Sequence, residues 1–376
     1  MVESGLQLYS LITSKGELRI GLEEQSVPAP EADEIVVKME AVPLNPSDLA
    51  LLSYPADLST GRTTGEGVDT VYSAEVPEHL MELVKARVGA PVPIGNEGSG
   101  TVIHAGSSAE AQALLGRTVA VIGGAMLTQY RVVKAGAALP MPEDVAARQA
   151  ASSFVNPMTA QAMVECMRLE GYEAIVHTAA ASNLGQMLNR LCQKDGVNLI
   201  NIVRNEEQEK ILRDSGARYV FNSTSENFSD ELTAAIAKTK AYLCFDAVGG
   251  GEIVENILVA MENAATKGAG SIGPYGSDTF KQIYIYGGLD RERTTLGRSY
   301  GFHWGVSGWL TSPFLARLDG AKLKSMRRRV ADEITTTFAS TYDREVSLVE
   351  ALQAENVLRY SRQSTGVKYL INPSFS

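Results

Sequence analysis

A short run of small residues in the middle of the chain could hold the diphosphate of a dinucleotide. Residues 179–185 read AAASNLG, between an apolar segment at 174–176 and a helical pattern at 186–191. Small side chains let a diphosphate approach the backbone, and the first turn of a helix offers N–H groups to its charge. The spacing is not Gly-x-Gly-x-x-Gly, so plain packing of a helix on a strand is the alternative. We expect four residues to meet the diphosphate, the last two through backbone N–H groups: Ala181, Ser182, Asn183 and Leu184.

The residue after the next apolar run bears on which nucleotide binds. In NAD-binding folds an acidic residue about 20 positions beyond the turn accepts a hydrogen bond from the adenosine ribose. Arg204 stands there, after the run 197–203. A guanidinium suits the 2′-phosphate of NADP and gives the ribose of NAD no acceptor, so the sequence predicts NADP(H) as the cofactor. The alternative is a solvated arginine whose charge Glu206 and Glu207 neutralise.

Two more glycine-marked turns follow apolar runs further along the chain. Residues 245–250 read FDAVGG, and residues 286–288 read YGG. Such a turn at the carboxyl end of a parallel strand is where the ribose and nicotinamide half of a dinucleotide passes. We therefore add three residues to the predicted cofactor site: Val248, Tyr286 and Gly287.

The elements that must position these turns are of two kinds. Up to residue 146, short β-prone runs are punctuated by Gly and Pro, which predicts an irregular β domain over 1–146. Residues 53–93 are expected to interrupt it as a polar loop with a short helix at 77–88. From 147 to 320, apolar runs alternate with helical patterns, which predicts a parallel, doubly wound sheet.

The C-terminal tail is expected to return to the first domain. Residues 321–376 hold two helical stretches and then an apolar run at 365–371 that predicts a final strand. A chain of 376 residues is long for a single core, which agrees with two domains.

Composition excludes several kinds of partner. The formal net charge of -10 argues against nucleic acid, which selects a basic surface. No apolar run approaches the roughly 20 residues that span a bilayer. The three cysteines lie far apart, and the N-terminus lacks the basic and apolar stretches of a signal peptide. These features predict a cytoplasmic protein with reduced thiols and no membrane or nucleic-acid partner.

Four further landmarks accompany the three turns above: residues 44–48, 95–100, 156–160 and 308–310. In their order and spacing, these landmarks resemble the zinc-independent branch of the medium-chain dehydrogenase/reductase superfamily, which holds quinone oxidoreductases and mitochondrial-type 2-enoyl thioester reductases. The resemblance implies an α/β fold with a GroES-like irregular β-barrel catalytic domain, a Rossmann domain with a doubly wound parallel sheet, and a homodimer.

Residue types at two of these landmarks argue against a metal. By the resemblance, Asn45 and Asn96 stand where zinc-dependent members carry a Cys and a His ligand. An amide is a poor zinc ligand, since Zn²⁺ sites use thiolate, imidazole or carboxylate. The first 165 residues contain no cysteine, so a four-cysteine site is impossible there. We therefore predict no metal, which disfavours alcohol oxidation.

The resemblance also implies roles for two residues of the first domain. Asn45 would lie near the nicotinamide; the alternative is a turn in which Asp48 caps the following helix. Tyr54 lies at roughly the place of the catalytic tyrosine of enoyl reductases; a loop tyrosine that packs on an apolar neighbour is the alternative, and Tyr72 is a weaker candidate.

Four further residues are implied to contact the cofactor. Asn156 and Thr159 would meet its nicotinamide side, or else cap a helix over 158–167. Trp309 would line the nicotinamide carboxamide, or else be a core aromatic. Lys368 would reach toward the cofactor phosphate, or else be a surface lysine.

Together these features predict an NADPH-dependent oxidoreductase that passes a hydride to a quinone or another conjugated carbonyl, without a metal. Catalysis would rest on proximity and orientation. A 2-enoyl thioester reductase is one alternative, favoured if the Tyr54 phenol lies near the nicotinamide. A non-catalytic NADPH-binding redox sensor is the other.

Overall fold

The computed structural model describes residues 4–267 and 273–375, and the chain divides into two compact units. Unit 1 comprises residues 1–155 and 327–376, and unit 2 comprises residues 156–326. The first boundary lies nine residues beyond the predicted 146 because the helix α3 (Ala147–Ala150) packs into unit 1. Ala147 of this helix is buried in one cluster with Ala41 and Leu370.

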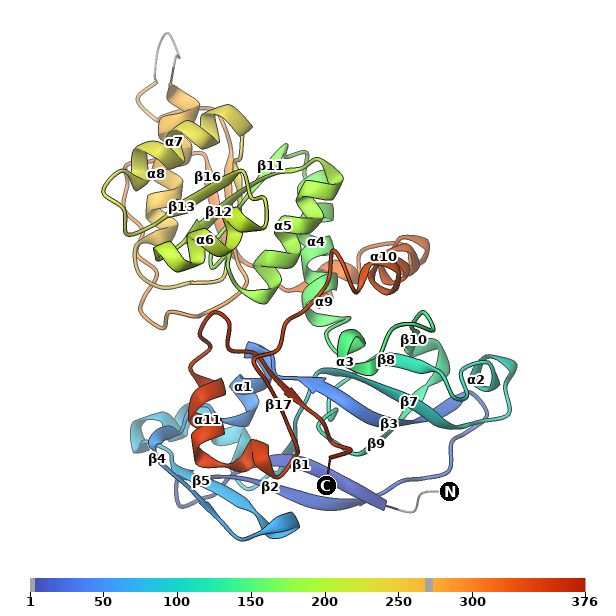
Figure 1. Cartoon of the computed structure of the whole chain (residues 1–376). Coiled ribbons are helices and arrows are strands. Elements are labelled where there is room, and N and C mark those ends of the chain that lie inside the picture. Colours follow the sequence, from blue (N-terminus) through green and yellow to red (C-terminus); the bar gives the residue numbers. More distant parts are fainter. Residues whose placement is uncertain (1–3, 268–272, 376) are drawn as a thin grey trace. The chain divides into compact units, whose positions relative to one another are not determined.

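Unit 1 is built from two sheets around one apolar core (Figure 1). The first sheet has the strand order β4-β5-β2-β1-β6, and the second has β10-β8-β7-β3-β18-β17, with β9 also paired to β3. The strands are β1 (Ser4–Ile12), β2 (Glu17–Ser26), β3 (Glu34–Pro43), β4 (Asp57–Thr64), β5 (Val71–Glu75), β6 (Val92–Pro93), β7 (Glu97–Ala105), β8 (Thr118–Ile122), β9 (Tyr130–Lys134), β10 (Leu139–Pro140), β17 (Arg344–Val346) and β18 (Tyr369–Ile371).

Short helices and 3₁₀ turns connect the strands of unit 1. The tail returns to unit 1 as predicted, since β18 pairs antiparallel with β3, but the final strand is shorter than the predicted 365–371. The helices and 3₁₀ turns of unit 1, besides α3, are α1 (Pro46–Leu52), α2 (Ala109–Gln112), α11 (Ala354–Ser361), η1 (Gly67–Asp69), η2 (Glu78–Arg87), η3 (Ala135–Ala137) and η4 (Glu350–Leu352).

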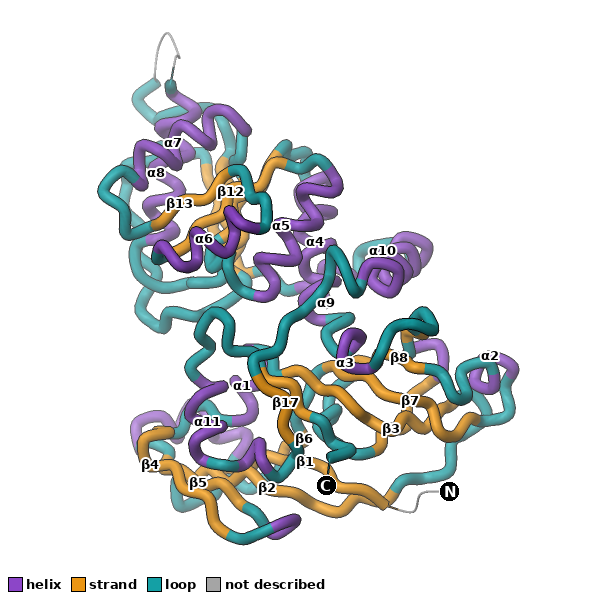
Figure 2. Tube along the Cα trace, in the orientation of Figure 1, coloured by secondary structure: helices purple, strands orange, loops and turns teal. Residues whose placement is uncertain are grey.

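The segment 53–93, predicted as a polar loop with a short helix, contains the strands β4, β5 and β6, so the prediction of a loop was wrong for these residues (Figure 2). Strand β4 pairs antiparallel with β5, and β5 pairs with β2. The threonines that made the segment read as a polar loop are β-branched and suit a strand with one solvent face. The expected helix at 77–88 is a 3₁₀ helix over Glu78–Arg87.

Unit 2 is a doubly wound parallel sheet, as predicted. Its order is β13-β12-β11-β14-β15-β16, and every neighbouring pair is parallel. The order reverses between β11 and β14, and ligands bind at such a switch point, outside the carboxyl ends of the strands. The strands are β11 (Ala174–His177), β12 (Asn198–Val203), β13 (Tyr219–Asn222), β14 (Leu243–Asp246), β15 (Lys281–Ile285) and β16 (Trp304–Gly308).

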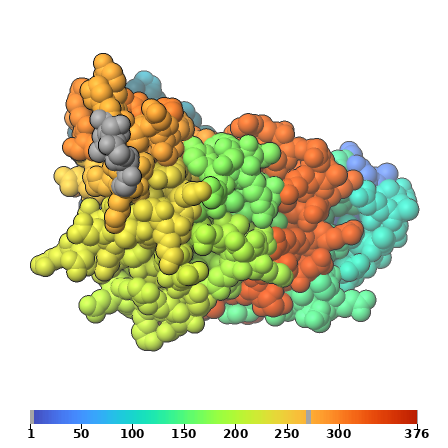
Figure 3. Space-filling model, turned by 90° about the horizontal axis from the view of Figure 1, so that it is seen from above, coloured from blue at the N-terminus to red at the C-terminus, as the bar shows by residue number. Residues whose placement is uncertain are grey.

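Helices accompany this sheet and connect it to the tail. Gln161 Nε2 of α4 donates to the carbonyl of Met326 in α10, and Lys322 pairs with Glu165, so the two helices lie side by side (green and orange-red in Figure 3). The helices are α4 (Val155–Leu169), α5 (Asn183–Asp195), α6 (Glu206–Asp214), α7 (Phe228–Thr239), α8 (Ile253–Thr266), α9 (Thr311–Leu315) and α10 (Gly320–Glu333).

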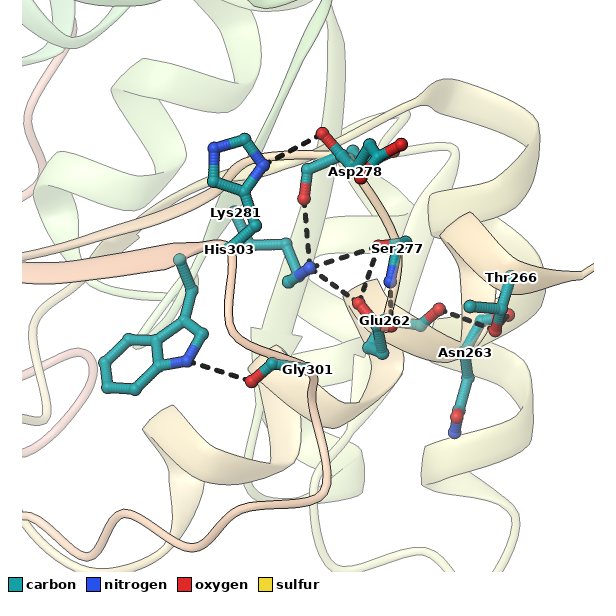
Figure 4. A network of polar contacts seen from close by, with 10 residues as sticks. Glu262, Asn263, Thr266, Ser277, Asp278, Lys281, Gly301 and His303 are labelled. Carbon is teal, nitrogen blue, oxygen red and sulfur yellow. Dashed lines mark hydrogen bonds and ion pairs between the residues drawn. The ribbon is translucent and has the colours of Figure 1, made fainter. Parts of the chain in front are cut away.

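A buried ion pair fixes the start of β15 (Figure 4). Lys281 is fully buried, and its ammonium donates to Glu262 Oε2 at 2.6 Å, to the carbonyl of Thr279 at 2.9 Å and to Ser277 Oγ at 3.2 Å. Three acceptors match the three N–H groups of a lysine, which a buried ammonium requires. The ion pair therefore holds β15 against α8.

Across residues 4–267 and 273–375, the helices are all too short or too polar to cross a bilayer.

Candidate functional site

The turn between β11 and α5 has the geometry that its residues predicted. Ser182 is the N-cap of α5, and its Oγ accepts the N–H of Gly185 at 3.1 Å. A Cβ at Gly185 would overlap the carbonyl of Ala180, so only glycine allows the helix to start this close to the turn. Asn183 and Leu184 are the first two residues of the helix, at the positive end of its dipole. Such a terminus suits an anion.

Arg204 follows the carboxyl end of β12, the strand beside β11. The pairing of His177 with Asn201 places the ends of these two strands next to each other. Arg204 is exposed, and its backbone N–H donates to Gln208 Oε1 at 3.1 Å. Within the described part of the chain its guanidinium forms no ion pair, so neither Glu206 nor Glu207 neutralises it.

A bridge between the carboxyl ends of β11 and β14 marks the switch point. Thr178 Oγ1 donates to Asp246 Oδ1 at 2.6 Å and accepts the N–H of Ala247 at 2.8 Å. The Asp246 carboxylate also accepts the N–H groups of Val248 and Gly249. These contacts fix the turn that carries Val248. Thr178 and Asp246 were not predicted as site residues, although both lie beside predicted turns.

Tyr286 follows β15, and its phenol contacts β11, which lies beyond β14 in the sheet. Its Oη lies 2.7 Å from Nε2 of the fully buried His177. Burial lowers the pKa of His177 to about 3, so the imidazole is neutral. A Cβ at Gly287 would stand 2.6 Å from the carbonyl of Ala247, which keeps this turn close to the one after β14. If the turn meets a ligand, it does so through its backbone and not through the phenol.

The other predicted cofactor residues of unit 2 are mostly enclosed. Asn156 and Thr159 lie near the start of α4, each 8% exposed, and Thr159 Oγ1 is 2.9 Å from Thr311 Oγ1. Trp309 is also 8% exposed, and its ring packs edge-on against Phe245 with centroids 5.1 Å apart. The indole of Trp309 is thus a core aromatic, the alternative weighed above. Ala181 is buried, and its carbonyl accepts Gln186 Nε2 at 2.9 Å.

A second group of polar residues gathers in unit 1, and we name it the Asn45 cluster: Asn45, Asp48, Glu97 and Lys368. Asn45 is 1% exposed and is itself the N-cap of α1. Its Nδ2 donates to Glu97 Oε1 at 2.9 Å, and its Oδ1 accepts from Lys368 Nζ at 3.1 Å. Asp48 lies inside the helix and accepts the backbone N–H of Asn45 at 2.8 Å, so the alternative in which Asp48 caps the helix is wrong.

Glu97 is the functional candidate that sequence reasoning missed. It is fully buried, and its Oε2 accepts the N–H groups of Phe154 at 2.7 Å and Val155 at 2.9 Å, where α4 begins. One carboxylate therefore ties Asn45 to the start of the helix that carries Asn156. The only signal in the sequence was an acid inside the small-residue landmark 95–100.

Burial perturbs all three charged groups of the cluster. It raises the pKa of Asp48 to about 7, against hydrogen bonds from the N–H groups of Asn45 and Asn96. It raises the pKa of Glu97, against the charge of Lys368. It lowers the pKa of Lys368 to about 8, against the charges of Glu97 and Asp48. Such coupled shifts are typical of functional sites and of structural ion pairs alike.

The side-chain amides of Asn45 and Asn96 both donate hydrogen bonds to protein groups. Asn45 Nδ2 donates to Glu97, and Asn96 Nδ2 donates to Ser47 Oγ at 2.9 Å. In the stretches 4–267 and 273–375, no three His, Cys, Asp or Glu side chains stand close enough together to hold a metal ion. The cation next to Asn45 is instead the ammonium of Lys368.

The two tyrosine candidates fall into different environments. The backbone carbonyl of Tyr54 accepts a hydrogen bond from Arg87 Nη1 at 3.2 Å. Tyr54 itself lies just after α1 and is half-buried. Tyr72 lies in β5 with 1% of its surface exposed, and burial raises its pKa to about 12. Tyr72 is therefore a core residue, and Tyr54 stays a prediction.

Known proteins resemble this chain in sequence and fold. No family model matches the sequence. The mitochondrial enoyl-[acyl-carrier-protein] reductase of Rattus norvegicus is 28% identical over 246 residues, which are 63% of this chain and 57% of that protein. A quinone oxidoreductase of Pseudomonas aeruginosa is 26% identical over 164 residues, 43% of this chain and 50% of that protein. The matched part thus spans about half the length of these relatives.

Similarity of fold extends over the whole chain. The crystal structure of Escherichia coli quinone oxidoreductase complexed with NADPH superposes with a TM-score of 0.68 and 16% identity, and the match covers 98% of this chain and all of that one. The relatives and the fold confirm the predicted resemblance to the quinone oxidoreductases and enoyl thioester reductases of the medium-chain dehydrogenase/reductase superfamily.

Proposed function

We propose that this chain is an NADPH-dependent oxidoreductase that passes a hydride, without a metal, to a quinone or a related conjugated carbonyl. The observation that carries the proposal is the edge of the parallel sheet where β11 and β12 end together. The start of α5 lies after one strand, and Arg204, whose guanidinium has no ion pair among the residues that the structure describes, lies after the other. A diphosphate and a 2′-phosphate of one nucleotide need these two groups on one edge.

The residues at this edge have separable roles. The first turn of α5, capped by Ser182, would hold the diphosphate, and Arg204 would hold the 2′-phosphate. The backbone around Val248 and Gly287 would line the ribose next to the switch point. The nicotinamide supplies the hydride when bound, and the protein supplies orientation. The Escherichia coli quinone oxidoreductase, which is similar in fold, was crystallised with NADPH, and this supports the choice of cofactor.

Nucleotide titration tests the proposal directly. We expect NADPH to bind more tightly than NADH, as followed by nucleotide fluorescence. Replacing Arg204 by Ala should weaken NADPH binding about 10- to 100-fold, the value of a charge-assisted contact of about 1.5–3 kcal/mol, and leave NADH binding unchanged. Arg218 is a matched control, since it is exposed before the amino end of β13. Failure to bind either nucleotide would refute the function, and a preference for NADH would refute the role of Arg204.

A second candidate is reduction of a 2-enoyl thioester. The rat relative is an enoyl-[acyl-carrier-protein] reductase, which favours it. NADPH oxidation followed with p-benzoquinone, cyclohexenone and crotonyl-coenzyme A separates the two, because only the last of these acceptors is a 2-enoyl thioester. We also propose that the chain forms a homodimer. Analytical ultracentrifugation of the purified protein tests this.

A further inference from the structure

A hollow of about 390 Å³ lies in unit 1, between the helix α11, the segment that follows it and the start of β17. Every residue that lines it belongs to unit 1. Sites for small molecules have volumes of about 300–1,000 Å³, so this hollow is large enough for a small metabolite.

Three arginines line the hollow: Arg344 at the start of β17, Arg359 in α11 and Arg362 directly after that helix. Arg359 Nη2 forms an ion pair with Asp343 Oδ2 at 2.9 Å. Arg344 and Arg362 are exposed, and neither side chain forms an ion pair or a hydrogen bond within the part of the chain that the structure describes. Two guanidinium groups, each with five N–H donors, are therefore open to a ligand.

The wall that carries Arg359 is held in place by the surrounding strands. Asp343, the partner of Arg359, donates its backbone N–H to the carbonyl of Lys368 at 2.8 Å. Asn356 of α11 is buried, and its Oδ1 accepts a hydrogen bond from Tyr369 Oη of β18 at 2.9 Å. These contacts preform the hollow, and a preformed site loses less conformational freedom when a ligand binds.

The charge of the hollow is opposite to that of the chain, whose formal net charge is -10. Of the lining residues only Glu355 is acidic, so positive charge exceeds negative charge even when Asp343 is counted. A guanidinium binds phosphate or carboxylate oxygens through two parallel N–H groups. A phosphate monoester carries a charge of about -1.5 to -2 at neutral pH, which matches the two arginines without an ion pair better than a single carboxylate does.

We propose that this hollow is a ligand site for a small organic phosphate. Arg344 and Arg362 bind its phosphate, and Leu358 and Val367, which also line the hollow, contact its carbon skeleton. Glu355 is the lining residue that opposes the anion. No step of the proposed hydride transfer depends on this site.

Calorimetric titration of the full chain with glycerol 3-phosphate tests the proposal. Saturating NADPH is present, so that the start of α5 is not available to the probe. We expect Arg344→Gln and Arg362→Gln each to weaken binding about 10- to 100-fold, the effect of losing a charge-assisted contact. Glu355→Gln should tighten binding about two- to tenfold, because it removes a like charge. The control is Arg62→Gln, an exposed arginine of β4 outside the hollow, which should leave the affinity unchanged.

Chemical modification locates the ligand independently of affinity. Phenylglyoxal reacts with exposed arginines, and peptide mass spectrometry measures the rate at each one. Glycerol 3-phosphate should protect Arg344 and Arg362 and leave the rate at Arg62 unchanged.

Malonate, a dicarboxylate of similar charge, separates a phosphate site from a general anion surface, and equal affinity for the two probes would overturn the proposed ligand class. Absence of binding, or equal losses in the Arg62, Arg344 and Arg362 variants, would overturn the site. Binding that needs Arg344 and Arg362 but disappears when NADPH is added would assign the hollow to the dinucleotide and overturn a separate ligand. A chain that binds no NADPH refutes the proposed function alone, because the variants still report on the hollow without nucleotide.

Discussion

Replacing Glu97 by Gln changes one atom of the buried carboxylate, and the structure predicts how much this substitution lowers the free energy of unfolding. Glu97 Oε2 accepts two backbone N–H groups, so the amide oxygen must take that place and the amide nitrogen must face Asn45 Nδ2, which is 2.9 Å away. Two donors then oppose each other. Rotating the Asn45 amide relieves this clash but turns its Nδ2 toward the ammonium of Lys368.

Either arrangement leaves one buried donor without an acceptor. An unsatisfied buried group costs about 1–3 kcal/mol, so Glu97→Gln should lower the free energy of unfolding by about that amount. Urea unfolding followed by circular dichroism measures it. The control is Glu66→Gln, an exposed glutamate of unit 1 that should stay within about 0.5 kcal/mol of the wild type.

A second substitution distinguishes this account from general disruption. Asn45→Asp in the Glu97→Gln background restores an acceptor for both the Gln amide and the Lys368 ammonium, and aspartate remains a good N-cap. The pair should therefore recover at least half of the lost stability, a coupling energy of about 1–2 kcal/mol. An unchanged stability in Glu97→Gln, or additive losses in the double variant, would refute the hydrogen-bond directions assigned here.

Three further predictions concern other parts of the molecule. Gly185→Ala should abolish tight NADPH binding in a fluorescence titration and destabilise the chain by about 1–3 kcal/mol, because its Cβ would overlap the Ala180 carbonyl; a variant that binds normally would show that the turn can move. Lys281→Met should cost about 3–5 kcal/mol in urea unfolding, because Glu262 loses its buried partner; a loss below about 1 kcal/mol would contradict this. The pKa of Lys368 is about 8 in the folded chain, below its value in the unfolded chain. Between these two pH values the folded chain binds fewer protons than the unfolded chain, so its free energy of unfolding should rise with pH there. Lys368→Met should lack this rise.

The parallel sheet of unit 2 could be predicted because its core strands are continuous apolar runs. β11, β12 and β14 are buried on both faces, so their sequences are largely apolar and do not alternate between apolar and polar residues. β16 was missed because it pairs on one side only and contains two glycines within Trp304–Gly308. An edge strand needs less apolar surface, so the pattern that identifies core strands is weak there.

The hairpin β4–β5 and the role of Glu97 escaped prediction for a different reason. In both, the decisive partners are distant in sequence: β5 pairs with β2, and Glu97 binds backbone groups at positions 154 and 155. Periodicity reports on local burial, and hydrogen bonds across tens of residues leave no trace in it. Arg204 and Ser182, by contrast, lie next to the strand and helix ends that the pattern locates, so their positions could be predicted from it.

The charge of the Asn45 cluster gives a reason why its cation should be a lysine. Asp48 and Glu97 are both buried, and two buried carboxylates that face each other without a cation resist ionisation together. Lys368 is the positive charge that favours their ionised forms. Removing it in Lys368→Met should therefore raise the pKa of both acids further, and the folded protein should take up protons near neutral pH that the wild type does not. Potentiometric titration of the two proteins compares this directly, and identical curves between about pH 5 and about pH 8 would mean that the ammonium does not control the two acids.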